Sequence, residues 1–495
     1  MNKKSKISSD SSFHEYLISK IRLNNNCFIL KFDNFLFGQN NMYPQLYHWL
    51  LSFCENNKIN YYNSVLKIFL WCIQGFMLFF LLNISERYLG YNVPIHIAIF
   101  GLIILYLNPF NFDSNNAKNI NLSPRLLGVV IGQLFLCFIA SYHITEEVIF
   151  LFLISIFIPL VIYTTQFTLQ FISIIFLVHI FFFETQIIIA YLLGLLFTVA
   201  INIKYFIFYF KMQLQHKTFY SKKLADQFIL KVRYSIWRDF IYDFWIKPKN
   251  KSFILYIYNN PVIQALFGFP LLIFFIINFV SNYENIYYIK NNGKVLLFFV
   301  PVLLCFFAFI ITSFRRTRFL GEPQRYLEFS TPFLVVLLIT NYHENILGVY
   351  LSFLLFLISL LTVYILKNKI SDIKNIKEIS LYKIKDYITN KSKIEKSVIF
   401  CNNLNITKKL LDTNNSFFWG MPVNEAIGNY NYKNVFDEYP IVSNDIIPEL
   451  IDSFKVDTVI IDTSVKSYNK SVINNINQKI KLAVKEGPLE IYNII

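Results

Sequence analysis

Long apolar runs constrain the fold of this chain more than any other feature. A helix needs about 20 mostly apolar residues to cross the hydrocarbon core of a bilayer. Ten runs approach that length, near 64–84, 93–110, 126–143, 147–164, 167–183, 187–210, 261–281, 294–313, 329–341 and 346–366. The sequence therefore predicts an α-helical polytopic membrane protein with about ten transmembrane helices, a multi-pass protein of the plasma or inner membrane.

The composition supports a membrane location and argues against nucleic-acid binding. Hydrophobic residues make up 55% of the 495-residue chain, aromatic residues 18%, and the mean hydropathy is +0.45. The net charge is +15, but the basic residues lie at the ends and in two loops, which suits anionic headgroups or phosphorylated lipids. Six cysteines without a CxxC or paired spacing predict no disulfide framework and no zinc site.

The polar and apolar segments divide the chain into three regions. Residues 1–62 form a polar N-terminal region, expected to be an extracytoplasmic loop that carries the acidic residue Asp10. Residues 63–366 form the transmembrane bundle, in which the basic and aromatic segment 211–260 suits an interfacial loop on the headgroups. Residues 367–495 change character and are expected to form a small soluble C-terminal α/β domain.

Short apolar segments in the C-terminal region predict its strands. They are SVIFC (397–401), SFFWG (416–420), DTVIID (457–462) and LEIYNI (489–494). Between them, the apolar stripe in NDIIPELIDSF (444–454) predicts a helix with Asn444 as its N-cap.

The segment RRTRFLGEPQRYLEFSTP (315–332) places charge at a membrane boundary. Ionisable groups are costly there, so several together indicate binding. Guanidinium groups hold phosphate oxygens through paired hydrogen bonds, and an aromatic neighbour can stack on a sugar or an isoprene. Arginines that only orient a helix would also fit, but orientation does not need Glu322 and Glu328. The candidate binding residues are Arg315, Arg316, Arg318, Glu322, Arg325 and Tyr326.

Three stretches together resemble the GT-C superfamily of polytopic membrane glycosyltransferases, including its mannosyltransferases and oligosaccharyltransferases. Residues 10–53 look like the family's first extracytoplasmic loop, with an acidic residue, an aromatic-His pair, an amphipathic helix and a Tyr-Pro. Residues 315–332 are similar to its Arg-Tyr element before a late helix that starts with proline. The tail, from DSFKVDTVIIDTSV to KLAVKEGPLEIYNII, resembles its closing α/β segment.

The resemblance implies an activity and assigns residues to it. A sugar would pass from a polyprenyl-phosphate carrier to a lipid, glycan or protein acceptor. Asp10 matches the family's acidic position and would be the base, although an Asp in a Ser-rich terminus can also be merely solvated. His14, one helical turn on, could face the same pocket and bond sugar or phosphate. Asp33 and Asp113 are secondary acidic candidates, because the family's second acidic group lies in a loop on the same face. Loop turns also favour Asp for structural reasons alone. The resemblance leaves the metal dependence of the activity open, and a divalent cation is the candidate cofactor.

The orientation in the membrane follows from two conflicting arguments. Ten spans would place all the long polar segments on one face. Ten basic against three acidic residues in 211–260 predict that this face is cytoplasmic, whereas the resemblance implies the outer face. Because a lipid phosphate site also explains the charge, we adopt the outer face. Family members carry a membrane helix before the acidic loop, but only nine residues precede Asp10. Either the chain starts late or that helix is absent.

A flippase or another transporter of lipid-linked glycans is the alternative function. Such a protein needs polar residues buried within the spans near the middle of the membrane. The apolar runs contain few of them, and the clearest are Gln133, Gln170, His179 and Lys204. This scarcity favours a site carried by loops. Glu146 and Glu147 would lie on the opposite face and mark a break between two helices.

Overall fold

The protein is described here from a computed structural model. It describes residues 9–36, 39–112, 122–181, 184–219, 260–281, 299–314, 317, 320–340, 350, 353–362, 364, 375–418, 426–427, 430–431, 435, 441–465 and 480–494.

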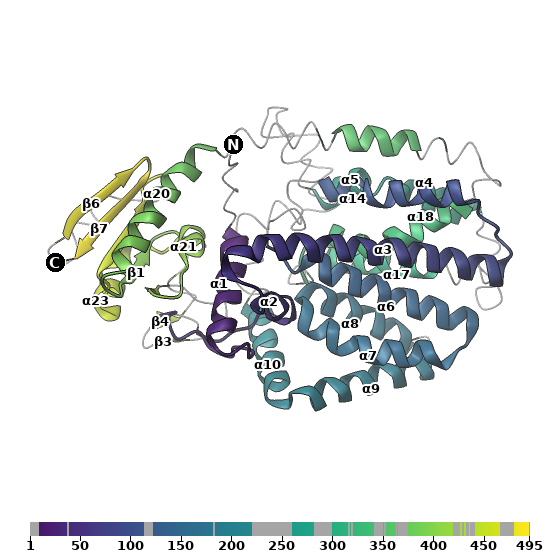
Figure 1. The fold of residues 1–495 in the computed structure, drawn as a ribbon, viewed down its shortest axis with the longest axis horizontal. Coiled ribbons are helices and arrows are strands. Elements are labelled where there is room, and N and C mark those ends of the chain that lie inside the picture. The colour runs from purple at the N-terminus through teal and green to yellow at the C-terminus, as the bar shows by residue number, and fades with distance from the viewer. Residues whose placement is uncertain are drawn as a thin grey trace.

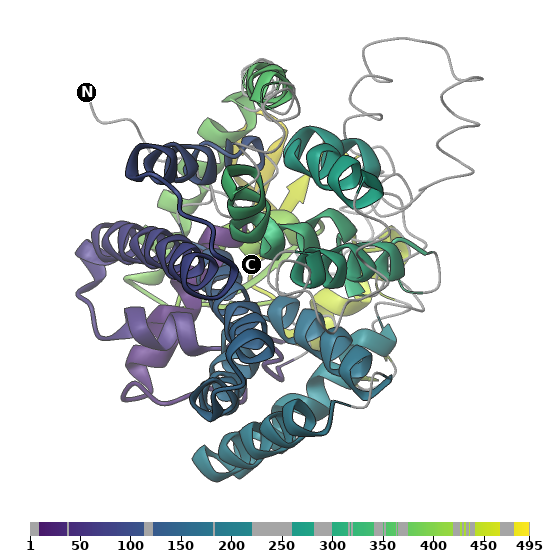
Figure 2. The same cartoon turned by 90° about the vertical axis from the view of Figure 1, so that its right-hand side faces the viewer.

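A bundle of helices lies beside a C-terminal sheet, with α1 and α2 between them (Figure 1). Before the bundle come α1 (Ser9–Leu23), α2 (Leu46–Ser52) and the 3-10 helix η1 (Asn56–Lys58). The bundle contains α3 (Ile59–Leu89), α4 (Ile95–Tyr106), α5 (Pro109–Phe112), α6 (Arg125–Thr145), α7 (Val148–Thr164), α8 (Gln166–Phe181), α9 (Thr185–Ile201), α10 (Ile203–Phe219), α14 (Pro261–Gly268), α15 (Leu271–Ser281), α17 (Val300–Thr312), the 3-10 helix η7 (Pro323–Ser330) and α18 (Thr331–Thr340). Viewed from its far end, several of these helices run nearly along the line of sight (Figure 2).

Two of the described helices are long and apolar enough to cross a membrane. They are the continuous helix Asn56–Leu89, which contains η1 and α3, and α6. A third span is present if α9 and α10 count as one, but they meet at a bend of 113°. The other apolar helices, α4, α7, α8, α17 and Phe353–Thr362, are shorter. The membrane-capable helices are thus fewer than the ten apolar runs of the sequence.

Two runs that the sequence predicts as single spans are each broken in two. The run 187–210 is interrupted at Asn202, whose side-chain oxygen accepts a hydrogen bond from the Tyr205 backbone N–H at 3.0 Å and so caps α10. The run 261–281 is interrupted between α14 and α15, where Pro270 cannot donate the backbone hydrogen bond that a continuous helix needs. By contrast, the predicted break at Glu146 and Glu147 is present, and helices also end before Thr165 and begin after Glu184.

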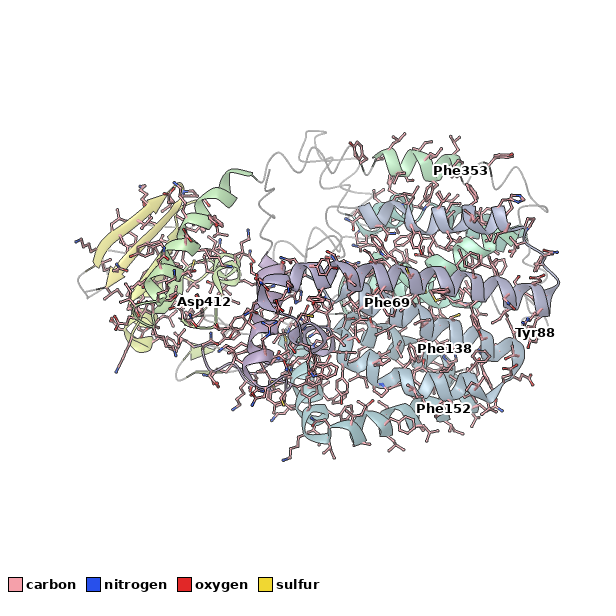
Figure 3. The ribbon with its side chains drawn as sticks, in the orientation of Figure 1. Phe69, Tyr88, Phe138, Phe152, Phe353 and Asp412 are labelled. Atoms are coloured by element: carbon pink, nitrogen blue, oxygen red, sulfur yellow. The ribbon has the colours of Figure 1, made fainter. Side chains whose placement is uncertain are left out.

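The surface of the bundle is apolar, as expected of a surface that faces lipid. Phe69, Phe76, Phe152 and Phe181 are 60%, 75%, 52% and 77% exposed, and Phe69 and Phe152 are labelled in Figure 3. Soluble proteins rarely expose apolar patches of this extent. The helix surfaces therefore agree with the composition in favouring a membrane environment.

Close packing around α6 depends on two glycines four residues apart. A Cβ at Gly128 would collide with Thr165, and a Cβ at Gly132 would collide with the ring of Phe329. Small residues spaced in this way let membrane helices approach closely. The absence of a side chain at Gly132 lets η7, which carries Phe329, pack directly on α6.

The C-terminal region forms a five-stranded mixed sheet in the order β2-β1-β5-β7-β6. Its elements are α20 (Asn375–Ser392), β1 (Val398–Cys401), α21 (Leu404–Leu410), β2 (Ser416–Phe417), the β3 and β4 hairpin (Ala426–Ile427, Tyr430–Asn431), the 3-10 helix η8 (Asn444–Ile446), α23 (Ile447–Phe454), β5 (Thr458–Asp462), β6 (Ile480–Glu486) and β7 (Leu489–Ile494). Strand β1 is parallel to β2 and β5, while β7 is antiparallel to β5 and β6.

The four predicted strand segments become β1, β2, β5 and β7, and β6 is an additional strand. The predicted N-cap is wrong. Asn444 lies inside η8, and the cap position of α23 is Ile446, which makes no side-chain hydrogen bond to the helix. The extra 3-10 turn shifts the start of the helix because Pro448, at its second position, needs no backbone donor there.

The N-terminal region packs against this sheet. Phe13 and Leu17 of α1 belong to one apolar core with Phe400 of β1. The Phe417 N–H donates to the Asn34 carbonyl at 2.9 Å, and the Leu36 N–H donates to the Phe417 carbonyl at 2.9 Å. Segments from the two ends of the sequence thus hold α1 at the end of the bundle.

Candidate functional site

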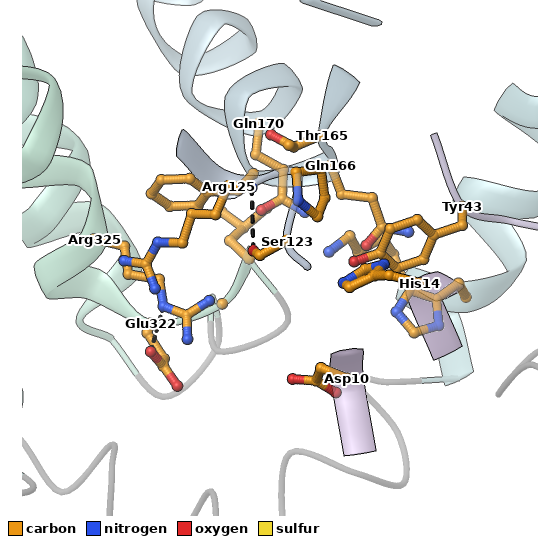
Figure 4. A pocket seen from close by; sticks show the side chains of 16 residues that line it. Asp10, His14, Tyr43, Ser123, Arg125, Thr165, Gln166, Gln170, Glu322 and Arg325 are labelled. Atoms are coloured by element: carbon orange, nitrogen blue, oxygen red, sulfur yellow. Dashed lines mark hydrogen bonds and ion pairs between the residues drawn. The ribbon is translucent and has the colours of Figure 1, made fainter. Parts of the chain in front are cut away.

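A cavity of about 280 Å³ lies where α1 meets the end of the bundle (Figure 4). Small-molecule sites are typically about 300–1,000 Å³, so it suits a small polar group. Its lining residues come from α1, the chain before α2, the start of α6, α8, α10 and the segment leading into η7. They are Asp10, His14, Tyr43, Ser123, Pro124, Arg125, Thr165, Gln166, Phe167, Gln170, His216, Lys217, Leu320, Gly321, Glu322 and Arg325.

Asp10 lies in the first turn of α1, where the helix dipole favours a carboxylate. Its Oδ1 pairs with Lys408 Nζ of α21 at 2.6 Å. The Lys408 ammonium lowers the pKa of Asp10 to about 2, burial opposes this, and His14 and Arg325 lower the pKa further. The side chain remains 51% exposed. Asp10 is therefore ionised at neutral pH and open to the cavity.

His14 lies one turn further along α1 and is buried. Its Nδ1 is 2.8 Å from Nε2 of His48, which belongs to α2. Burial is the main cause that lowers the pKa of His14 to about 3, and it lowers the pKa of His48 well below the usual value. Both rings are therefore neutral at pH 7. His14 can exchange hydrogen bonds with a ligand, but it brings no positive charge, and His48 holds its ring in place.

Arg325 and Glu322 form an ion pair across one turn of η7, on the far side of the cavity from Asp10 (Figure 4). Gly321, which precedes them, has a φ of +103°, a conformation that favours glycine. The Phe329 ring of η7 stacks on Phe171 of α8, with the ring centroids 4.0 Å apart. This stacking and the contact with Gly132 fix the helix that carries the ion pair.

Arg125 begins α6 and pairs with Glu328 of η7. Both side chains are almost fully buried, with exposures of 7% and 1%. Next to them, Gln133 Nε2 donates to the Glu328 carbonyl at 2.9 Å, and Gln74 Nε2 donates to Gln133 Oε1 at 2.7 Å. The sequence favoured a binding role for Glu328, because orientation of a helix does not need a carboxylate. Instead it holds Arg125, and the polar chain fastens η7 to α6 and α3.

Four of the predicted site residues, Asp10, His14, Glu322 and Arg325, line the one cavity. Asp10 and Arg325 come from opposite halves of the sequence, and the Arg325 guanidinium helps to lower the pKa of Asp10. The sequence could place them together only through the resemblance, since no local pattern links them.

Two predicted residues do not line the cavity. Tyr326 is fully buried because η7 turns its ring into the bundle, where its hydroxyl donates to the Leu320 carbonyl at 2.7 Å. A stacking role on substrate does not follow from that position. Asp33 is exposed in a turn that packs beside the C-terminal sheet, as expected of a turn aspartate. Arg315, Arg316, Arg318 and Asp113 lie outside the described residues.

Sequence reasoning missed three basic residues at the site. Arg125 was detectable, because it follows Ser-Pro and opens a long apolar run. Lys217 and its neighbour His216 line the cavity from α10. Both lie in the segment 211–260, for which the sequence predicts an interfacial position. Lys408 had no signal, since its contact with Asp10 spans nearly the whole chain.

No known family model matches this chain, and no curated protein is significantly similar to it.

Proposed function

We propose that this chain is an integral-membrane glycosyltransferase of GT-C type, which crosses the plasma or inner membrane about ten times. It transfers a sugar from a polyprenyl-phosphate donor to a lipid, glycan or protein acceptor on the outer face. The observation that carries the proposal is the meeting of Asp10 and Arg325 in one cavity at the end of an apolar bundle. A base and a cation facing each other are what transfer from a sugar phosphate requires.

The reaction follows from the positions of the charges. The Asp10 carboxylate accepts the proton of the acceptor hydroxyl while the acceptor oxygen forms a bond to the anomeric carbon. The bond between that carbon and the phosphate oxygen breaks, and its electron pair leaves with the polyprenyl phosphate. Arg325, and Arg125 deeper in the cavity, stabilise the negative charge that develops on the phosphate.

His14 and Tyr43 bind and orient the sugar in this scheme, since both line the cavity next to Asp10. No step is assigned to a divalent cation. The two carboxylates that line the cavity, Asp10 and Glu322, are each already paired with a basic side chain. Arg315, Arg316 and Arg318 keep their proposed role in binding the phosphate or the headgroups.

A flippase is the competing function. Among the described residues, Gln133, the clearest polar group of the spans, is bonded to Gln74 and to the Glu328 backbone. Because these groups satisfy one another in a packed interior, they offer a glycan no free hydrogen-bonding partners. This favours chemistry in the cavity over passage through the bundle.

The test is transfer of radiolabelled sugar from a panel of polyprenyl-phosphate sugars in membranes that contain the protein. Asp10→Asn removes the base and keeps the shape of the side chain, so incorporation should fall by about 10²–10⁴-fold. Asp33→Asn is the matched control, because it makes the same change in the same region outside the cavity. It should retain wild-type incorporation.

Full incorporation by Asp10→Asn would refute the proposed mechanism. Wild-type vesicles that flip a fluorescent lipid-linked glycan but transfer no sugar would establish the competing function instead.

A further inference from the structure

A second cluster of ionisable side chains lies at the opposite end of the bundle. His143 is near the end of α6, His179 is near the end of α8, and Glu184 directly precedes α9. His143 lies about 27 Å along α6 from Arg125, at roughly 1.5 Å per residue. That is close to the thickness of a hydrocarbon core, about 30 Å. The cluster is therefore separate from the cavity and plays no part in the proposed transfer.

The two distances from Glu184 to the histidines match the separation of neighbouring ligands around a tetrahedral metal ion. Oε2 of Glu184 is 3.4 Å from Nε2 of His143 and 3.4 Å from Nε2 of His179, and all the ligand atoms lie within 4.8 Å of one another. Zinc–ligand bonds of about 2.0–2.1 Å place neighbouring ligands of a tetrahedron about 3.3–3.4 Å apart. Hydrogen bonds between nitrogen and oxygen are usually shorter, about 2.7–3.2 Å.

The surroundings of the cluster hold these atoms in position. His179 Nδ1 lies 2.8 Å from the Ile175 carbonyl, which places the proton on Nδ1 and leaves the Nε2 lone pair facing Glu184. Histidines that bind metals usually donate their other N–H in this way. The Glu184 N–H donates to the His179 carbonyl at 3.2 Å. Tyr142, next to His143, donates to Gln186 of α9, so both sides of the cluster are fixed.

We propose that His143, His179 and Glu184 bind a divalent transition-metal ion of the zinc class. Two imidazoles and one carboxylate form a ligand set that zinc uses, with water in the fourth position. The ion joins the ends of α6, α8 and α9 at the membrane boundary opposite the cavity. The proposal departs from the expectation of no zinc site, which rested on the cysteines alone.

Metal binding can be measured directly with Co²⁺, which occupies zinc sites and absorbs visible light when tetrahedral. The full-length protein in detergent, stripped with a chelator and dialysed, should bind one Co²⁺ with a visible band that Zn²⁺ abolishes. His179→Ala and Glu184→Gln should each weaken binding by about 10–100-fold or more. His96→Ala changes an exposed histidine of α4 and should bind as the wild type does.

The variants also distinguish this site from the proposed function. Asp10→Asn should keep the Co²⁺ band even though it loses transfer. Zn²⁺ should raise the Tm of the wild type but not that of Glu184→Gln, whose nearly unchanged shape preserves folding. The proposal would be overturned if the wild type showed no Co²⁺ band, or if His179→Ala and Glu184→Gln bound Co²⁺ as tightly as the wild type.

Discussion

The two ends of α6 carry charge in different ways. At the Arg125 end, ionisable groups from α1, α6, α10, α21 and η7 surround an open cavity. At the His143 end, the three groups come from helices linked by short turns, and they face one another directly. Ionisable groups around an open cavity can act on a ligand that enters it, whereas ionisable groups in direct contact can share a metal ion or a proton. Under the proposed functions, the first end carries out the transfer and the second end anchors the helices.

Breaking the Arg125–Glu328 pair has the largest expected effect. It tests whether the stability of the cavity end depends on this buried ion pair. Removing one partner of a buried ion pair typically costs about 3–5 kcal/mol, since the other charge is left buried. We expect Glu328→Ala to lower the free energy of unfolding in mixed micelles by about that amount. The double variant Arg125→Met/Glu328→Leu should recover much of the loss.

Glu147→Ala is the control for the other end of the helix. Glu147 is an exposed acid between α6 and α7, and its loss should change the free energy of unfolding by less than about 0.5 kcal/mol. A Glu328→Ala variant as stable as Glu147→Ala would show that the buried pair does not hold η7 to α6.

Gly132 gives an intermediate effect that connects packing with the cavity. A leucine there would collide with the Phe329 ring and push η7, with Arg325, away from α6. Overpacking of this kind costs typically about 1–3 kcal/mol, and sugar transfer should fall by about 10-fold or more. Phe76→Leu, which introduces a leucine at an exposed position of α3, controls for the substitution itself. If Gly132→Leu transferred sugar as fast as the wild type, the position of η7 would not control activity.

The sequence predicts the local features of the fold and fails on contacts between distant segments. The apolar runs locate the helices, and the short apolar segments locate β1, β2, β5 and β7, because both patterns are set within a few residues. The bend at Asn202 and the split at Pro270 were missed because the length of an apolar run hides a single interrupting residue. Arg125 with Glu328, Lys408 with Asp10, and the cluster around Glu184 depend on how helices pack, which no spacing in the sequence encodes.

Replacing Lys408 has the smallest expected effect on transfer at neutral pH, but its effect on the pH profile is the most specific. It lowers the pKa of Asp10 from 3.8 to about 2, so Asp10 stays ionised well below neutrality. In Lys408→Met this pKa rises, since burial then acts unopposed by the ammonium, and the acid limb of the pH profile of transfer moves to higher pH. Transfer by the variant should therefore begin to fall as the pH approaches 3.8, the ordinary pKa of an aspartate, where the wild type is still flat. Lys383→Met, which breaks an exposed ion pair with Glu486 in the same region, should follow the wild-type profile. Identical profiles for both variants would mean that the C-terminal domain does not act on the base, and the cavity would then be a site built by the bundle and α1 alone.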